Sequence, residues 1–323
     1  MKKTTAITTL LLCVLSLLTS CNRGTKEETS PKKLRIAIVT NNSSDWWAIA
    51  RKGGDDAAKE LGNVDLDFRM LPEGTAAAQK ALIDDLLARG VDGIMVSPLD
   101  VENQQEMLNS VAGKTLLFTL GADAPRSNRV EYVGSDDADA GKMAGESVRK
   151  ALPNGGKIMV FVGRSDAQNA VERLNGLKKG IEGGNIEIID VRTDEADSAK
   201  AKMNAADTFT KYADIAGMVG LWSYNTPAIV NAAKDAGKLG KVKIVGFDED
   251  DQTLQAIKDG FVSATVAQQP YGFTKDAIKR MAAILQGDRS NIPADKKAIF
   301  PTQIVDQTNV DTFWADLKKN RGR

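Results

Sequence analysis

The residues best suited to chemistry are polar and aromatic side chains that follow the first apolar run. Residues 40–44 supply hydroxyl and amide groups, and Trp46 and Trp47, two of only four tryptophans, come directly after them. An indole ring packs against the C–H face of a sugar while neighbouring Asn, Asp, Gln and Arg side chains pair with its hydroxyl groups. Adjacent helix positions point about 100° apart, so we expect one tryptophan in a core and the other free for a ligand.

The composition excludes several catalytic classes. The 323 residues include 43 basic and 43 acidic side chains, two cysteines and no histidine. Without histidine, the Ser-His-Asp relay, the HExxH zinc site and the usual neutral-pH general base are absent. The balanced charge lacks the basic footprint of a nucleic-acid binder, so we expect no nucleic-acid partner. The length suits two domains of roughly 150 residues each.

The first 20 residues have the order of an export signal. Lys2 and Lys3 precede an apolar stretch over 6–18 that is too short to span a bilayer. The following Leu18-Thr19-Ser20-Cys21 is similar to a bacterial lipobox, in which the cysteine carries lipid after cleavage. We predict a lipoprotein signal peptide over 1–20, a lipidated Cys21, a flexible tether over 21–33 and a periplasmic or cell-surface protein anchored to a membrane. The alternatives are a plain signal peptide or a buried apolar helix, with Cys21 an incidental thiol.

From residue 34 onward, short apolar runs alternate with amphipathic stretches, which predicts repeated βα units. Near-continuous apolar runs such as 36–39 and 93–96 suit parallel strands covered by helices on both faces. Right-handed crossovers then build a doubly wound layer. The first series has expected strands at 34–40, 64–71, 92–97, 115–120 and 131–134, and expected helices at 46–61, 76–89 and 101–112.

A second series of the same kind begins at Gly156, which predicts a second α/β lobe and a boundary near 134–137. Its expected strands lie at 157–162, 186–191, 217–221 and 242–247, and its helices at 137–151, 168–182, 199–212, 227–236 and 251–259. Three later segments, a strand at 263–267, a helix at 271–286 and a strand-like tail at 298–304, can return to the other lobe. Acidic residues at 136–137 and 248–251 are expected to cap the helices that follow them.

Phosphate and metal motifs fail on spacing. Gly113-Lys114-Thr115 has Leu108 where a P-loop needs glycine, and it precedes a strand instead of following one. No GxGxxG follows the first strand. The acidic run at 248–251 has Thr253 where an EF-hand needs glycine, so we expect neither a metal nor a cofactor. Once Cys13 is removed and Cys21 carries lipid, the mature chain has no cysteine for a metal site or a nucleophile.

Four segments together resemble periplasmic sugar-binding proteins of the ribose/galactose type, the ligand receptors of bacterial ABC importers. They are the first strand and turn ending in Trp46-Trp47, the segment 132–137 (YVGSDD), the segment 245–248 (VGFD) and the segment 264–270 (ATVAQQP). The resemblance implies an α/β fold of two Rossmann-like lobes with parallel sheets joined by three hinge strands, the type I periplasmic binding protein fold. It assigns 34–134 plus about 265–290 to the N-terminal lobe, and 135–264 plus about 291–323 to the C-terminal lobe.

The resemblance also implies ligand-binding positions. Arg173 is similar to an arginine whose fork donates two hydrogen bonds to adjacent hydroxyls. Either Asn225 or Trp222 takes the place of an asparagine from the second lobe. Gly121 and Ala122 stand where ribose-type relatives have Asp-Arg, which argues against ribose and leaves Asp123 to supply the carboxylate. The expected ligand-binding residues are Thr40, Ser44, Trp46, Trp47, Asp123, Ser135, Arg173, Trp222, Asn225, Asp248 and Gln268.

The resemblance implies a receptor and not an enzyme. We expect a monomer that captures a monosaccharide or derivative and delivers it to an ABC transporter permease. A sugar-sensing subunit for chemotaxis or a sensor kinase remains an alternative. An exported carboxylate-dependent glycoside hydrolase needs two facing carboxylates, and the sequence singles out no such pair. A sugar-responsive repressor needs an N-terminal helix-turn-helix where an export signal stands. For the polar residues, the structural alternatives are turns for Asp123 and Ser135, capping for Asp248 and a surface ion pair for Arg173.

Overall fold

The computed structural model describes residues 33–321. The expected signal peptide, the lipidated Cys21 and all but the last residue of the tether lie outside this range. Among the described residues, no helix combines the length and the apolar character needed to cross a membrane. These residues belong to a compact unit that begins at Lys33.

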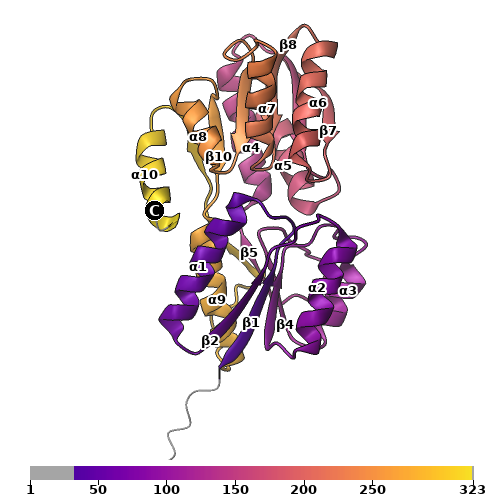
Figure 1. Ribbon diagram of the computed structural model, residues 1–323, viewed down its shortest axis with the longest axis vertical. Coiled ribbons are helices and arrows are strands. Elements are labelled where there is room, and N and C mark those ends of the chain that lie inside the picture. The colour runs from indigo at the N-terminus through magenta and orange to yellow at the C-terminus, as the bar shows by residue number, and fades with distance from the viewer. Residues whose placement is uncertain (1–32, 322–323) are drawn as a thin grey trace, which may run out of the picture. The chain divides into compact units, whose positions relative to one another are not determined.

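The first lobe is built on a six-stranded sheet in the order β11-β5-β4-β3-β1-β2, in which every neighbouring pair is parallel. Helices α1 and α9 cover one face, and α2 and α3 cover the other (Figure 1). Its strands are β1 (Leu34–Val39), β2 (Val64–Arg69), β3 (Gly93–Val96), β4 (Leu116–Leu120), β5 (Glu131–Gly134) and β11 (Lys297–Ile299). Its helices are α1 (Asp45–Leu61), α2 (Ala76–Ala88), α3 (Gln105–Ala112) and α9 (Pro270–Leu285).

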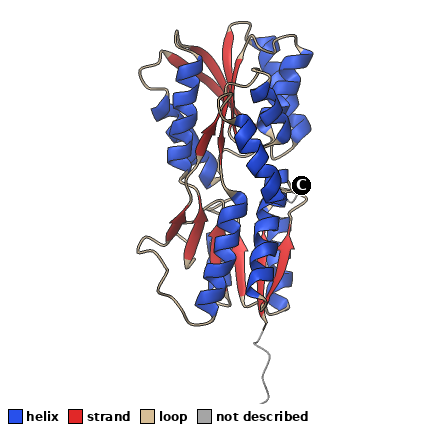
Figure 2. Cartoon of the chain, turned by 90° about the vertical axis from the view of Figure 1, so that its left-hand side faces the viewer, coloured by secondary structure: helices blue, strands red, loops and turns tan. Residues whose placement is uncertain are grey.

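The second lobe repeats this plan with the order β12-β10-β9-β8-β6-β7, and only β12 is antiparallel to its neighbour. Helices α4 and α5 pack on one face and α6, α7 and α8 on the other, so strands lie between helices in each lobe (Figure 2). Its strands are β6 (Gly156–Val162), β7 (Ile186–Thr193), β8 (Ile215–Gly220), β9 (Lys243–Phe247), β10 (Ala264–Ala267) and β12 (Gln303–Val305). Its helices are α4 (Asp137–Ala151), α5 (Gln168–Gly180), α6 (Ser198–Lys211), α7 (Asn225–Asp235), α8 (Asp251–Lys258) and α10 (Val310–Arg321).

The chain passes between the two sheets three times: after β5, after β10 and between β11 and β12. The doubly wound fold of two lobes is therefore as the sequence predicts. The late boundaries differ, because β10 pairs with β9 in the second sheet and β11 pairs with β5 in the first. The expected single strand over 298–304 is wrong, because this segment forms two strands in different sheets, β11 beside β5 and β12 beside β10. Pro301 cannot donate a ladder hydrogen bond, and the chain leaves one sheet there for the other.

Two features position the helices beside the pocket: aspartate caps, which the sequence predicts, and close glycine contacts between α4 and α5. Asp136 caps α4 by accepting from the Asp139 amide at 3.0 Å, and Asp250 caps α8. Helices α4 and α5 approach so closely that a Cβ on Gly141 would lie 2.1 Å from the backbone oxygen of Arg173. A Cβ on Gly176 would lie 2.1 Å from a backbone oxygen of α4. This contact fixes the backbone of Arg173 relative to the start of α4.

Candidate functional site

A pocket lies between the two lobes, at the carboxyl ends of their strands. This is the position where open α/β sheets bind ligands. Both lobes contribute to the wall. The lining residues are Asn41, Asn42, Ser44, Trp46, Trp47, Ser97 and Gly121 from the first lobe, and Asn169, Arg173, Trp222, Ser223, Asp248 and Gln268 from the second.

Two tryptophans form the aromatic wall of this pocket. Trp46 and Trp47 stand in the first turn of α1, with ring centroids 4.6 Å apart and planes at 81°. The Trp47 indole N–H donates to Asn41 Oδ1 at 3.0 Å, which fixes its ring. The expectation that only one of them enters the core is wrong. Both belong to the same apolar cluster, because at a helix end both rings can reach the interior while one edge of each still meets the pocket.

Arg173 provides the positive charge of the second lobe's wall. Its Nε donates to Asp137 Oδ1 at 2.7 Å, and its Nη1 donates to the carbonyl of Leu221 at 2.7 Å. The guanidinium carbon lies 4.5 Å from the centroid of the Phe247 ring. These contacts leave Nη2 to face a ligand. The structural alternative for Arg173, a surface ion pair, is wrong because the Arg173 and Asp137 side chains are each only 3% exposed.

Asp248 is the acidic member of the wall, and its backbone is strained. It follows β9 with φ of 68°, a left-handed conformation that costs a non-glycine residue of the order of 1 kcal/mol or more and is concentrated at functional sites. Gln268 Nε2 donates to Asp248 Oδ1 at 2.6 Å. Burial raises the pKa of Asp248, while Arg173 and the Gln268 amide oppose the shift. The strained turn therefore aims a buried carboxylate into the pocket, beside a donor and a cation.

Several buried polar atoms of the pocket wall have no partner among the described residues. They include two donors, the Trp46 and Trp222 indole N–H groups, and two acceptors, Asn169 Oδ1 and Gln268 Oε1, together with the Ser97 hydroxyl, which can do either. Buried polar groups are nearly always hydrogen-bonded, so five unpaired atoms around one pocket indicate a missing polar ligand. A ligand that both donates and accepts, such as one with several hydroxyl groups, can pair with both kinds of atom.

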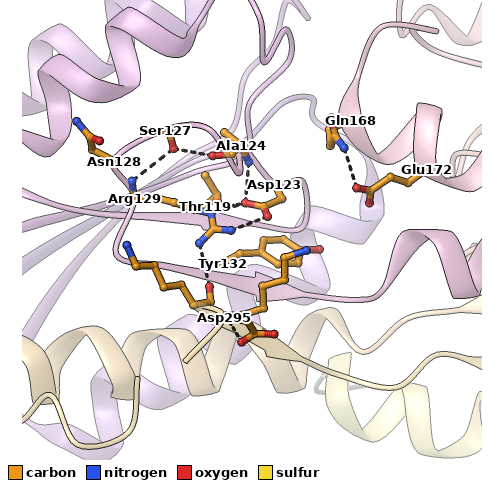
Figure 3. Close-up of polar contacts among 12 residues, drawn as sticks. Thr119, Asp123, Ala124, Ser127, Asn128, Arg129, Tyr132, Gln168, Glu172 and Asp295 are labelled. Atoms are coloured by element: carbon orange, nitrogen blue, oxygen red, sulfur yellow. Dashed lines mark hydrogen bonds and ion pairs between the residues drawn. The ribbon is translucent and has the colours of Figure 1, made fainter. Parts of the chain in front are cut away.

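Asp123, an expected ligand-binding residue, lies outside the pocket wall. It forms a buried ion pair with Arg129, whose Nη2 is 2.7 Å from Asp123 Oδ2 (Figure 3). Its Oδ1 also accepts from the Thr119 hydroxyl at 2.8 Å and the Ala124 amide at 2.7 Å. With its lone pairs engaged, the carboxylate holds the loop after β4. Gly121 in the same loop does line the pocket, where it packs against the Trp46 ring.

Thr40 and Asn225 also lie outside the pocket wall, because each side chain bonds to backbone. The Thr40 hydroxyl accepts from the Leu71 amide at 2.9 Å. Asn225 Oδ1 accepts from the Trp222 amide at 3.0 Å, and its Nδ2 donates to Asp194 at 2.8 Å. Of the two alternatives for the second lobe, Trp222 is the one that lines the pocket.

Ser135 lies in the first crossing between the lobes and not in the pocket wall. Its carbonyl accepts from the Tyr132 hydroxyl at 2.9 Å, and its own hydroxyl is buried without a hydrogen bond to the described residues. Its position suits a hinge residue better than a ligand contact.

The remaining expected residues, Ser44, Trp46, Trp47, Arg173, Trp222, Asp248 and Gln268, are brought together in the pocket. Sequence reasoning did not single out six others that line it. Asn41 and Asn42 belong to the polar turn already noted, and Ser97 directly follows β3, so strand-end position was a usable signal. Asn169 and Ser223 had no signal of their own, and Gly121 was noted only as a departure from the relatives. Within residues 33–321, no cluster of three acidic side chains is placed to hold a metal ion.

Buried carboxyls give an expected pH dependence of stability. Burial raises the pKa of Asp137 to about 6, against the effect of Arg173, and raises that of Asp194 to about 6. A raised folded-state pKa means that the protonated form stabilises the fold, so this stability is present below about pH 4 and is lost as pH rises through 6. For Asp137 alone the change is roughly 3 kcal/mol. We expect a higher thermal midpoint at pH 5 than at pH 7.5, measured by calorimetry without ligand; an equal or lower midpoint at pH 5 contradicts it.

Known proteins are similar to this chain in sequence and in fold. The periplasmic binding protein domain family matches residues 36–289. The chain is 27% identical over 304 residues to the ribose import binding protein RbsB of Haemophilus influenzae, covering 93% of this chain and 99% of the relative. It is 26% identical over 275 residues to the D-allose-binding periplasmic protein of Escherichia coli, covering 81% of this chain and 88% of the relative. Among solved structures, GanP, a glucose-galactose binding protein from Geobacillus stearothermophilus, superposes with a TM-score of 0.81 at 24% identity, covering 86% of this chain and 99% of GanP.

The family match covers most of the chain, and the two-lobed architecture agrees with it. Three crossings join two doubly wound lobes around a pocket at their strand ends. The chain therefore belongs to the periplasmic binding protein family and has its type I fold.

Proposed function

We propose that this protein captures a monosaccharide or a monosaccharide derivative in the pocket between its lobes and delivers it to an ABC transporter permease. The observation that carries the proposal is the wall of the pocket, where the Trp46 and Trp47 rings from one lobe meet Arg173 and Asp248 from the other. Aromatic rings pack against the C–H groups of a sugar, and a guanidinium group donates hydrogen bonds to its adjacent hydroxyls. Relatives named for binding ribose and allose support this class of ligand.

The pocket favours a neutral ligand. Arg173 and Asp248 are its only charged lining residues, and their formal charges cancel. The unpaired atoms at Ser97, Asn169 and Trp222 add neutral donors and acceptors. A missing or inverted hydroxyl would leave one of these buried groups unpaired, at a cost of about 1–3 kcal/mol, which is a source of selectivity between sugars. Gly121 in place of the charged pair of ribose-type relatives argues for a sugar other than ribose.

Binding works through closure of the two lobes. The first lobe supplies the tryptophans and Ser97, and the second supplies Arg173, Asp248 and Asn169, so neither lobe alone completes the site. A ligand held by one lobe shifts the hinge equilibrium toward the closed form by its extra contacts with the other. The closed protein then docks on a permease. Asp248 is the only carboxylate in the pocket wall, so the pair that a glycoside hydrolase requires is not assembled there, which supports binding without chemistry.

The proposed location is an exported one, and the N-terminal sequence supports it. The apolar stretch over 6–18 and the lipobox-like Leu18-Thr19-Ser20-Cys21 support export and a lipid anchor at Cys21. A tethered monomer would keep its ligand pocket near the membrane that holds the permease. Mass spectrometry of the protein purified from its membrane fraction tests the anchor, which predicts a diacylated N-terminal cysteine.

The test of sugar binding is a thermal-shift screen followed by calorimetry. The panel contains D-ribose, D-allose, D-galactose, D-glucose, D-arabinose and myo-inositol. We expect at least one to raise the thermal midpoint and to bind with one site per chain. Asp248→Ala should weaken that binding about tenfold or more, because it removes a buried, charge-assisted acceptor. The matched control Asp65→Ala, at an exposed position on β2, should leave the Kd unchanged. Absence of binding across a broader monosaccharide panel, or an unchanged Kd in Asp248→Ala, rejects the proposal.

A further inference from the structure

Asp137 is a buried carboxylate directly behind the pocket wall. It stands in the first turn of α4, immediately after the first crossing between the lobes, and only 3% of its side chain is exposed. It does not line the pocket. Its Oδ1 accepts from Arg173 Nε at 2.7 Å, so it contacts the pocket only through that arginine.

We propose that Asp137 is a positioning residue, which orients the Arg173 guanidinium for the ligand only while its carboxylate is ionised, so that ligand affinity falls in mildly acidic medium. The proposal rests on the proposed function, since it concerns the same pocket. It goes further by assigning a role to a residue outside the pocket wall and by predicting how binding responds to protons.

The geometry leaves Asp137 as the main determinant of where the guanidinium points. The α4–α5 contact at Gly141 fixes the backbone of Arg173 but not its long side chain. That side chain has three contacts: the carboxylate of Asp137, the carbonyl of Leu221 and the face of Phe247. The carboxylate is the only one of the three with a full opposite charge; Asp248 also attracts the guanidinium but forms no hydrogen bond with it among the described residues. When Asp137 is protonated, the Arg173 Nε–H loses its charged acceptor, and the attraction of Asp248, a neutral carbonyl and a ring do not hold the guanidinium in this direction as firmly.

Burial, more than the surrounding charges, moves the titration of Asp137 toward neutral pH. The groups that act on it are Arg173 and Glu172 on α5, Asp248 in the β9–α8 turn and the Tyr132 phenol on β5. Burial raises the pKa of Asp137 to about 6, with Glu172 and Asp248 acting in the same direction and Arg173 against it. Ionisation is therefore nearly complete at pH 7.5 and largely lost at pH 5.

The position of Asp137 also connects the ligand to the hinge. Two residues earlier, the Ser135 carbonyl accepts from the Tyr132 hydroxyl at 2.9 Å, which ties the crossing to the end of β5. A ligand that holds Arg173 in place thus acts, through Asp137, on the start of the segment that must bend when the lobes close. The Asp137–Arg173 ion pair therefore influences the open–closed equilibrium as well as the affinity of the pocket for its ligand.

Calorimetric titration of the purified chain at pH 8, 7, 6 and 5, with the best-binding sugar of the panel above, tests the affinity. We expect the wild-type Kd to be constant from pH 8 to 7 and to rise about tenfold between pH 7 and pH 5, as expected when binding requires the ionised form of a group with a pKa near 6. Asp137→Asn should bind more weakly at pH 7, and its Kd should rise less between pH 7 and pH 5 than that of the wild type. The control Asp194→Asn removes another buried carboxyl with a pKa of about 6, outside the pocket wall, and should keep the tenfold rise.

A ligand-free measurement separates this inference from the proposed function. In wild-type protein, the NMR signal of the Arg173 Nε–H should shift with a midpoint near pH 6, and the Asp137 side-chain carbonyl carbon should titrate with the same midpoint. In Asp137→Asn the Arg173 signal should not titrate there. If no sugar binds but the two signals titrate together, the proposed function fails and the positioning role stands. A wild-type Kd that does not change between pH 7 and 5, an Asp137→Asn profile like that of the wild type, or an Arg173 signal without this midpoint overturns the inference.

Discussion

Replacing Arg173 by methionine is expected to weaken sugar binding by about 2–5 kcal/mol, which is roughly thirtyfold or more, because a buried charged partner is removed from the pocket. The same change should lower the free energy of unfolding by about 3–5 kcal/mol, since it leaves the Asp137 carboxylate buried without its cation. Calorimetry with the best-binding sugar measures the first effect, and urea denaturation of the ligand-free protein measures the second.

The double variant Arg173→Met with Asp137→Asn separates the two roles of the arginine. Removing both charges takes away the uncompensated carboxylate, so most of the lost stability should return. The affinity should not return, because the guanidinium that faces the pocket is still missing. An Arg173→Met protein that binds within threefold of the wild type would show that the arginine is not a ligand-binding residue.

The second large effect is expected at Gly141, where α4 and α5 meet. A Cβ at this position would lie 2.1 Å from the Arg173 backbone oxygen and 2.7 Å from its Cα. These are backbone atoms, so the two helices must separate to admit a methyl group. We expect Gly141→Ala to lower the free energy of unfolding by about 3 kcal/mol or more, at or above the upper end of the usual range for overpacking. It should also weaken sugar binding, because Arg173 moves with α5.

A glycine-to-alanine control at an open helix end checks that the loss comes from packing. Gly113 follows α3 with φ of −75°, and a Cβ there would meet nothing closer than 3.6 Å. Gly113→Ala should leave the free energy of unfolding unchanged or raise it by up to about 1 kcal/mol. If Gly141→Ala and Gly113→Ala unfold at the same urea concentration, the close α4–α5 contact does not hold this lobe together.

The fold could be predicted from the sequence where local patterns agree with the tertiary structure. Runs such as 36–39 and 93–96 are apolar at every position because β1 and β3 are covered on both faces. The tail at 298–304 could not be read in the same way. Pro301 signals an interruption there, but only long-range pairing decides that β11 joins the first sheet and β12 the second.

The pocket could be predicted only in part, because side-chain direction after a strand is not visible in the sequence. Thr40 and Trp46 both lie in the short segment after β1. The Thr40 hydroxyl points inward and accepts from the Leu71 amide, whereas Trp46 lines the pocket. Asp123 has the chemistry of a ligand-binding carboxylate, but it forms an ion pair with Arg129, six residues later. Asn169 had no pattern of its own, since its place in the wall follows from how α5 packs on α4.

A crystal structure with the best-binding monosaccharide would show whether the pocket between the lobes holds a sugar. We predict one sugar per chain, with its C–H groups against Trp46 and Trp47 and its hydroxyls bonded to Arg173 and Asp248. The buried atoms now unpaired at Ser97, Asn169 and Trp222 should each gain a partner from the sugar or from a water that it holds. A sugar bound outside this pocket, or a pocket that stays free of sugar at saturating concentration, would contradict the account.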